Sequence, residues 1–334
     1  MTKKWPMVSI CTPTFNRRPF IPMITKCIEN QDYPRDCIEW IIVDDGTDKI
    51  GDLVEHLPYV KYYAIDKKMV LGKKRNLMHS YCKGDYIVYM DDDDYYPPKR
   101  IKHAVKQLQK NPKYLIAGSS ALFIYFNHLS EVWKFGPYRE NHATAGTFAF
   151  KKELLEQTRY QEEKAIAEEK FFLKDYTIPL LQLDPKQVIM VFSHSQNTFD
   201  KKKLIAHGET NFVRKYNKKI ESFDIDNSIL NWFRSEMEPA LEKYSQGRIE
   251  NKPEVLKQTK EIENKLLNNS LSAITLKING KIKRLTNKEV IELINKLSRD
   301  LNEQKNLNKL YKDKLVVLKK ENEELTSISG PVKE

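Results

Sequence analysis

The sequence predicts an α/β fold with a mostly parallel sheet, because short apolar runs alternate with amphipathic stretches along the first two thirds of the chain. Four runs have the length and composition of buried strands: residues 8–11, 38–43, 60–64 and 86–90. Three segments have the apolar spacing of helices: residues 20–30, 73–81 and 99–110. Strand–helix alternation is typical of parallel sheets, whose ligands bind at the carboxyl ends of the strands.

Length and composition indicate about two domains with a sizeable core. The chain has 334 residues, 40% of them hydrophobic, and a formal net charge of +11. This charge permits a polyanionic, phosphorylated or membrane-surface ligand without choosing among them. No apolar run reaches the ~18–20 residues of a membrane helix, and the first residues lack a signal-peptide pattern. We therefore expect a cytoplasmic location and no transmembrane segment.

Three predicted strands end in polar clusters: residues 12–17, 44–45 and 91–94. The last cluster consists of four consecutive aspartates after an apolar strand. Like charges raise each other's pKa and destabilise the fold unless a cation neutralises them. Oxygen ligands at this density suit Mg²⁺ or Mn²⁺. A solvated acidic turn is the alternative interpretation.

Residues 89–92 spell the Tyr-Met-Asp-Asp tetrapeptide of reverse-transcriptase palms. In a palm this tetrapeptide lies at a hairpin turn and a second strand follows it. Here two further aspartates, two prolines and a helix follow, and the chain is too short for a polymerase. We therefore expect no nucleic-acid partner.

Four segments, taken in their order along the chain, resemble a second group of enzymes and account for more residues than the reverse-transcriptase tetrapeptide does. They are Val-Ser-Ile-Cys-Thr-Pro-Thr-Phe-Asn-Arg at 8–17, Ile-Ile-Val-Asp-Asp-Gly-Thr-Asp at 41–48, Gly-Lys-Lys-Arg-Asn at 72–76 and the aspartates ending at 94. With these segments, residues 6–220 resemble the family 2-like glycosyltransferases of the GT-A fold, which carry a D-x-D motif. The resemblance implies a hexosyltransferase that uses a nucleotide sugar, with UDP as the expected nucleotide.

The resemblance also implies a donor site and a metal site. Asp44 or Asp45 would accept from a base N–H group, and Arg75 would offset the diphosphate charge. The expected donor-binding residues are Pro13, Thr14, Phe15, Arg17, Asp44, Asp45, Lys73, Arg75, Asp91, Asp92 and Gly146. The expected ligands of Mn²⁺ or Mg²⁺ are Asp93, Asp91 and His194.

An acceptor hydroxyl needs a base, and the family's Glu-Asp pair falls at two glutamates in this chain. We expect Glu169 as the catalytic base of an inverting displacement, with Glu168 as the second candidate, although both can belong to one acidic helix face. Trp133, Phe135 and Tyr138 are candidates for an acceptor platform or for the core. The acceptor is expected to be a glycan or a protein, with hydroxylysine of a collagen-like chain as one example.

The strand–helix alternation ends in the last part of the chain. We expect a transferase domain at 1–222, a helical region at 223–273, and a β-hairpin with a long helix at 274–334. The Asn-Gly pair at 279–280 indicates the hairpin, and Thr286 and Glu289 form a capping-box pattern. Apolar positions then step by four and three, which is typical of a coiled coil. A homodimer through this helix is expected, and one amphipathic helix packed on its own chain is the alternative.

Two other functions remain open from the sequence. A sugar-1-phosphate nucleotidyltransferase shares the fold type and the metal, but its glycine-rich phosphate loop is missing from residues 8–18. A non-catalytic coiled-coil scaffold with a degenerate transferase domain is the second alternative. The retained aspartates count against it.

Overall fold

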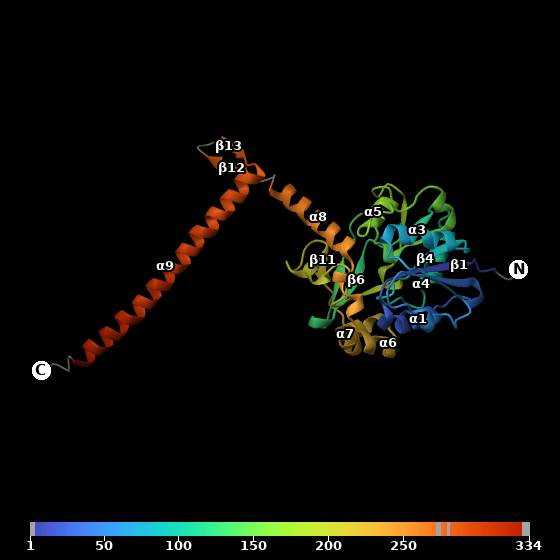
Figure 1. Ribbon diagram of the computed structural model, residues 1–334, viewed down its shortest axis with the longest axis horizontal. Helices are drawn as coiled ribbons and strands as arrows, with labels where there is room; N and C mark the ends of the chain where they lie inside the picture. The colour runs from blue at the N-terminus through green and yellow to red at the C-terminus, as the bar shows by residue number, and fades with distance from the viewer. Residues whose placement is uncertain (1–3, 272–274, 279–280, 329–334) are drawn as a thin grey trace. The chain divides into compact units, whose positions relative to one another are not determined.

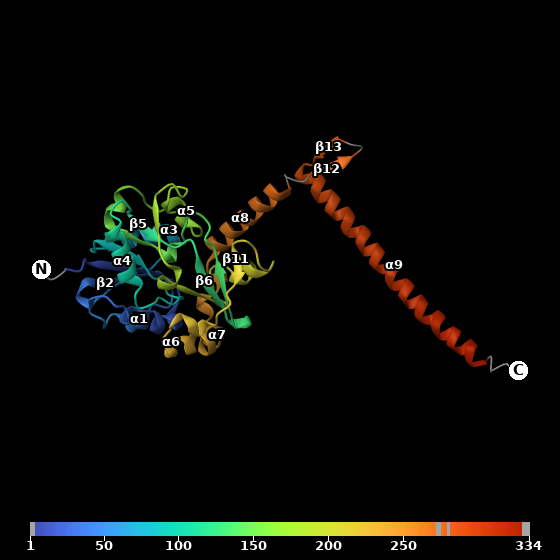
Figure 2. The ribbon, with the colours of Figure 1, turned by 180° about the vertical axis from the view of Figure 1, so that it is seen from behind.

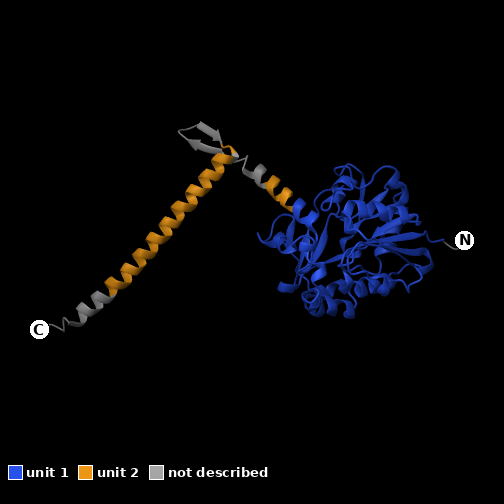
Figure 3. Cartoon of the chain, in the orientation of Figure 1, with its two compact units in different colours: residues 1–258 blue, residues 259–334 orange. Residues whose placement is uncertain are grey.

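The computed structural model describes residues 4–271, 275–278 and 281–328, and the chain divides into two compact units. The first is Met1–Gln258 and the second is Thr259–Glu334 (Figure 3). The boundaries expected at 222 and 273 differ from this single division. Residues 223–258 belong to the first unit because Ile229, Phe233 and Leu241 are buried in its core.

Seven strands form the main sheet in the order β3-β2-β1-β4-β8-β5-β9. Their bounds are β1 Val8–Thr14, β2 Ile38–Asp44, β3 Val60–Ala64, β4 Tyr86–Tyr89, β5 Ile116–Gly118, β8 Ala149–Lys151 and β9 Leu180–Gln182. The pairs β1–β2, β2–β3, β1–β4 and β5–β9 are parallel, and β8 runs antiparallel to β4 and β5. The predicted mostly parallel sheet is confirmed, and the carboxyl ends of β1, β2 and β4 meet at one edge.

Helices cover both faces of this sheet (Figures 1 and 2). The five helices of this part are α1 Ile21–Glu29, α2 Gly51–Val54, α3 Leu71–Tyr81, α4 Arg100–Lys110 and α5 Glu168–Phe172. On β2, Trp40 and Ile42 pack in the core that includes α1 and α4, whereas Ile41 and Val43 pack in the core that includes α3 and α5. Burial on both faces explains why the strands appear as continuous apolar runs.

A second sheet, in the order β10-β6-β7-β11, lies in the same unit. Its strands are β6 Leu122–Phe126, β7 Glu131–Phe135, β10 Met190–Ser193 and β11 Val213–Lys215. A bridge between Tyr95 and Met190 links β10 to the segment after the aspartates. Two short helices follow, α6 Asn227–Asn231 and α7 Met237–Glu242. β10 thereby brings His194 next to the acidic cluster.

The end of the chain contains α8 Pro253–Leu271, the strands β12 Thr275–Ile278 and β13 Lys281–Arg284, and α9 Asn287–Ile328. β12 and β13 pair antiparallel as predicted, while the Asn-Gly pair between them lies outside the described residues. The capping box is confirmed, because the Thr286 N–H donates to Glu289 Oε2 at 2.8 Å. Among the described residues, no helix has the length and apolarity needed to cross a bilayer.

Candidate active site

A cavity of about 380 Å³ lies at the carboxyl ends of β1 and β4. Eight of the predicted site residues line it: Pro13, Phe15, Arg17, Arg75, Asp91, Asp92, Asp93 and Glu168. Further lining residues come from loops, from α3 and from the start of α8: Lys68, Met69, Leu71, Lys74, Asp94, Ala165, Ile166, Ala167, Thr198, Phe199, Lys201, Lys252, Glu254 and Val255. The lining includes six basic and six acidic side chains. Such a wall suits a ligand that carries both an anionic group and a cation.

The four aspartates follow β4 and lie in different environments. Arg17 approaches two of them, with Nη2 at 3.3 Å from Asp93 Oδ2 and Nε at 3.6 Å from Asp92 Oδ1. Burial opposes ionisation of Asp93, but Arg17 and His194 outweigh it and hold its pKa well below the usual range. Burial raises the pKa of Asp92 to about 7. Asp94 Oδ1 accepts from the Phe192 N–H at 3.2 Å, which ties the cluster to β10.

His194 and Asp93, two of the three predicted metal ligands, are in contact. His194 Nε2 lies 3.1 Å from Asp93 Oδ2, and burial lowers the histidine pKa to about 4, so its ring is neutral. The oxygen and nitrogen donors are of the types that Mn²⁺ accepts. Within the described residues, however, no group of three or more His, Cys, Asp or Glu side chains surrounds one point. The residues fit a cation that takes its remaining ligands from the substrate or from water.

Arg75 connects the aspartates to α5. Its Nε donates to Glu168 Oε1 at 3.0 Å, and its Nη2 lies 3.7 Å from Asp91 Oδ1. Its guanidinium carbon also lies 4.6 Å from the ring centroid of Tyr89. Arg75 Nη1 and Asp91 Oδ1 are buried and, within the described part of the chain, have no hydrogen-bond partner. A bound ligand would supply hydrogen-bond partners to these two buried atoms.

Glu169 differs from its neighbour Glu168. Only Glu168 lines the cavity, and its carboxylate is held by Arg75. Burial, and then the charge of Glu168, raise the pKa of Glu169 to about 7. A carboxyl group with this pKa exchanges protons readily near neutral pH.

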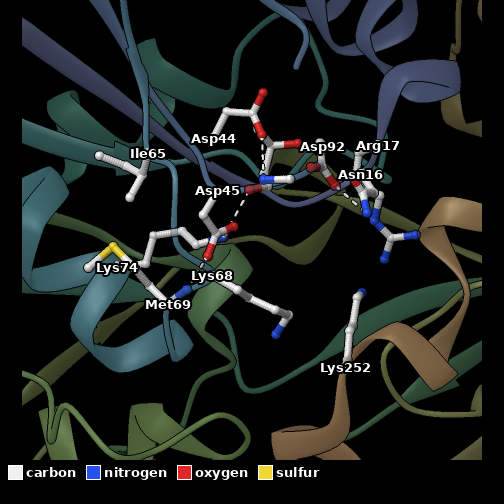
Figure 4. A network of polar contacts seen from close by, with 12 residues as sticks. Asn16, Arg17, Asp44, Asp45, Ile65, Lys68, Met69, Lys74, Asp92 and Lys252 are labelled. Atoms are coloured by element: carbon white, nitrogen blue, oxygen red, sulfur yellow. Dashed lines mark hydrogen bonds and ion pairs between the residues drawn. The ribbon is translucent and has the colours of Figure 1, made fainter. Parts of the chain in front are cut away.

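The two aspartates at the end of β2 do not line the cavity. Asp44 is fully buried and accepts from the backbone N–H groups of Gly46 and Ile50 at 2.9 and 3.0 Å, and from the Tyr62 hydroxyl at 2.7 Å. Its oxygens therefore shape the turn after β2. Asp45 accepts from the Met69 N–H and pairs with Lys74 (Figure 4).

Three further predicted donor residues stand behind the cavity wall or away from it. Lys73 is exposed, and its neighbour Lys74 is buried and donates to the Thr14 carbonyl at 2.9 Å. Thr14 is also buried. Gly146 lies behind Asp91, because a Cβ at this position would come within 2.8 Å of Asp91 Oδ2. A glycine here leaves room for that carboxylate.

Comparison with known families agrees with this geometry. Residues 9–159 match the family model described as glycosyl transferase family 2. By this match, residues 9–159 resemble a family 2 glycosyltransferase domain. The match covers β1 to β8, with the aspartates and Arg75, and ends before Glu168.

Curated proteins similar to this region include several from bacteria. One is the poly(ribitol-phosphate) beta-N-acetylglucosaminyltransferase TarS of Staphylococcus aureus. The two sequences are 27% identical over 101 residues, and this aligned region covers 29% of this chain and 18% of TarS. Another is the putative colanic acid biosynthesis glycosyl transferase WcaA of Escherichia coli. The two sequences are 32% identical over 104 residues, and this aligned region covers 30% of this chain and 37% of WcaA. The chain thus spans well under half of the length of these relatives.

One similar solved structure is TarS residues 1–349 of S. aureus in complex with UDP. Its TM-score is 0.46 and its sequence identity is 17%, and the comparison covers 84% of this chain and 96% of that one. A mannosyltransferase of Pyrobaculum calidifontis in complex with GDP-Man and Mn²⁺ also has a TM-score of 0.46 and 17% identity, with coverage of 70% of this chain and 71% of that one.

A second cavity shares no lining residue with the first, which is here called the transferase cavity. Its wall is formed by Tyr138, Arg139, His142, Lys170, Asp175 and Tyr176. The ring centroids of Tyr138 and His142 are 5.2 Å apart, and those of His142 and Tyr176 are 5.0 Å apart. Of the three predicted platform residues only Tyr138 is exposed, since Trp133 and Phe135 are buried in the core.

The residues that sequence reasoning missed lie mainly on loops and beyond the matched region. Lys68, Thr198, Lys252 and Glu254 belong to none of the four motifs. Lys201 belongs to a run of three lysines at 201–203, a basic pattern that suits an anionic ligand. Tertiary folding, which motif spacing does not encode, brings these groups together.

Proposed function

We propose that this chain transfers a hexose-type sugar from a UDP-sugar to a hydroxyl group of a glycan or protein acceptor, by an inverting single displacement. The observation that carries the proposal is the cavity in which Asp91 and Asp93 face Arg17 and Arg75 at the end of β4. The family match of residues 9–159 supports the reaction class. The names of the relatives, which include transferases of N-acetylglucosamine, support a nucleotide-sugar donor.

The cavity charges suit a diphosphate and a divalent cation together. Basic and acidic side chains are equal in number on its wall, so a bound cation would leave a positive surplus. A nucleotide-sugar diphosphate carries the compensating negative charge. Arg17 and Arg75 can each grip phosphate oxygens with two N–H groups. Phe15 and Pro13 provide apolar surface for the base.

Asp93 and Asp91, with His194, would hold Mn²⁺ or Mg²⁺, and the diphosphate would complete the ligand set. A cation bound there would stabilise the charge that develops on the departing UDP. His194 contacts Asp93, and Arg75 lies near Asp91 and can orient it. Arg17 lies close enough to Asp93 to stabilise the same charge.

Glu169 is the proposed base. Its pKa of about 7 allows it to take the proton of the acceptor hydroxyl at neutral pH, whereas Glu168 is held by Arg75. Glu168 of α5 lines the transferase cavity, and Lys170 of the same helix lines the second cavity. An acceptor in the second cavity would stack on Tyr138 and Tyr176 and reach Glu169 from that side.

The test of this proposal is release of UDP from a panel of UDP-sugars with Mn²⁺, using glycan acceptors and a hydroxylysine-containing collagen peptide. Turnover with one donor, stimulated by one acceptor, would support the proposal. Retention of the donor configuration would contradict the inverting step, and NMR of the product distinguishes the two anomers. Binding of UDP-sugars without turnover for any acceptor would favour the scaffold alternative.

We also propose that α9 forms a homodimeric coiled coil. Its apolar side chains are exposed along the single chain, for example Leu297, Leu301, Leu315 and Leu318. A coiled-coil partner would bury such a row. Val290, near the start of the helix, packs instead with Leu285 and Leu293.

A further inference from the structure

Residues 244–258, here called the C-terminal strap, cross the transferase cavity although they lie beyond the matched residues 9–159. The strap begins beside β1. Asn16 Nδ2 donates to the Gln246 carbonyl at 3.0 Å, and the Tyr244 hydroxyl donates to Asp48 Oδ2 at 2.9 Å. A Cβ on Gly247 would come within 2.8 Å of the Asn16 carbonyl oxygen, so the strap packs closely here.

The other end of the strap contacts the loop before α5. Gln258 Nε2 donates to the Glu163 carbonyl at 2.7 Å, and Gln258 Oε1 accepts from the Ala165 N–H at 2.9 Å. Between the two ends, Glu254 forms an ion pair with Lys68 on the cavity wall. The strap is therefore anchored on two opposite sides of the cavity and once between them.

Lys252 is the basic residue of the strap that lines the cavity (Figure 4). Its side chain is buried, with 7% of the residue exposed, and Nζ lies 3.2 Å from Thr198 Oγ1. In the described part of the chain it makes no ion pair. Burial, reinforced by Arg17, lowers the pKa of Lys252 well below its usual value, while Asp93 and Asp92 oppose this shift.

Burial without a counter-ion disfavours the ammonium form of Lys252, and an anionic ligand would favour it again. The base and ribose of a nucleotide sugar are neutral, and its diphosphate is anionic. Lys252 shares the cavity wall with Arg17 and Lys201, which are also cationic. An anion that reaches this wall would therefore meet three cations supplied by three separate parts of the chain.

We infer that Lys252 is a donor-positioning residue, which the C-terminal strap places in the cavity to bind the diphosphate of the nucleotide sugar. This inference rests on the proposed function, since it requires a nucleotide diphosphate in the cavity. It adds a contact from outside the family-matched region. A consequence is that donor binding depends on residues immediately before and within the first turns of α8.

The test is calorimetric titration of UDP, UMP and uridine, each with Mn²⁺, into the full chain and three variants. Lys252→Met removes the charge and keeps the stem, whereas Lys252→Arg retains a cation. Lys257→Met is the matched control, because Lys257 belongs to the same strap, in the first turns of α8, and is exposed. We expect Lys252→Met to weaken UDP binding by about 10- to 100-fold, as for a lost charge-assisted hydrogen bond, and to leave uridine binding unchanged. Lys252→Arg and Lys257→Met should bind UDP within about threefold of the wild type.

Equal UDP affinity of the wild type and Lys252→Met would overturn the inference. A parallel loss of UDP and uridine affinity would also overturn it, because it would indicate a structural role. If the wild type binds neither UDP nor GDP, the proposed function fails first and the inference falls with it.

Hydrogen exchange of the wild type gives a second readout that needs no variant. Residues 244–258 should gain protection when UDP binds and should not when uridine binds. Equal protection by the two ligands would contradict a contact between the strap and the diphosphate.

Discussion

Arg75 donates to Glu168 at 3.0 Å and faces Asp91 at 3.7 Å, so one guanidinium joins the strand that carries the aspartates to the helix that carries the proposed base. These residues come from α3, α5 and the end of β4. The same side chain can therefore hold the donor side and the base side of the site in fixed relation. Its substitution should affect both stability and activity.

Arg75→Met leaves Glu168 buried without its partner. We expect a loss of about 3 to 5 kcal/mol in the free energy of unfolding, as for other broken buried ion pairs. Urea denaturation measures this loss. Arg75→Met/Glu168→Gln should lose less than the sum of the single variants, and additive losses would contradict a coupled pair.

Glu169→Gln should reduce kcat by about 100-fold or more, as expected when a general base is removed, without weakening UDP binding. In the wild type, kcat/KM should fall as the pH drops below about 7, because the carboxyl becomes protonated. Glu163→Gln, an exposed neighbour, is the control. A variant Glu169→Gln with normal kcat, beside an inactive Glu168→Gln, would transfer the role to Glu168.

The raised pKa of Glu169 also predicts a pH-dependent difference in stability. Between its unfolded-state pKa and about 7, the folded chain binds more protons than the unfolded chain, so this group lowers stability as the pH rises. Glu169→Gln cannot titrate. Its stability relative to the wild type should therefore increase up to about pH 7 and then level off. Thermal unfolding at several pH values checks this, and a constant difference would contradict the shift.

Asp93→Ala should abolish the part of UDP binding that depends on Mn²⁺, with little change in fold. The reason is that Asp93 is the aspartate in contact with His194 and is held ionised. Titration of UDP with Mn²⁺ and with EDTA measures the effect, and the exposed Asp66→Ala serves as the control. Unchanged affinity with Mn²⁺ would contradict the assignment of Asp93 as a metal ligand.

Asp44→Asn should destabilise the fold by about 1 to 3 kcal/mol, because one carboxylate oxygen serves Gly46 and the other serves Ile50 and Tyr62. UDP affinity of the folded variant should not change. Denaturation and titration of the same preparation separate the two effects. A stable variant with lower UDP affinity would contradict a purely structural role and would support Asp44 as a donor-binding residue.

Leu301→Asp/Leu315→Asp should convert a dimer into a monomer, because both leucines belong to the exposed apolar row of α9. Light scattering measures the mass, and Ser298→Asp places a charge on the same helix outside that row. A wild-type monomer, or a dimer that survives the double substitution, would contradict the coiled-coil proposal.

Much of the fold was predictable because burial on both faces of the parallel strands leaves continuous apolar runs. β2, with all seven residues buried, is the clearest example. The second sheet was largely missed, since β6 and β7 form a local hairpin but their pairs with β10 and β11 are nonlocal. Residues 188–192 form an apolar run that suits a strand, but the bridge between Met190 and Tyr95 depends on tertiary structure.

The candidate site was predictable where a motif places a side chain directly after a strand, as with Asp91 and Asp93. The site was less predictable where two adjacent residues of a helix differ in which side of the helix they face. Lys74 faces inward and Lys73 faces solvent, because adjacent residues of a helix point about 100° apart. Lys252 was invisible to motif reasoning, since only the packing of the C-terminal strap brings it to the cavity.

The measurement that tests the central claim most directly is calorimetric titration of UDP into the chain with Mn²⁺ and again with EDTA, alongside GDP. The account predicts that UDP binds with Mn²⁺, that binding collapses in EDTA, and that GDP binds more weakly. Such a result would support the donor cavity and the aspartate metal site together. Binding of neither nucleotide under either condition would contradict the donor site.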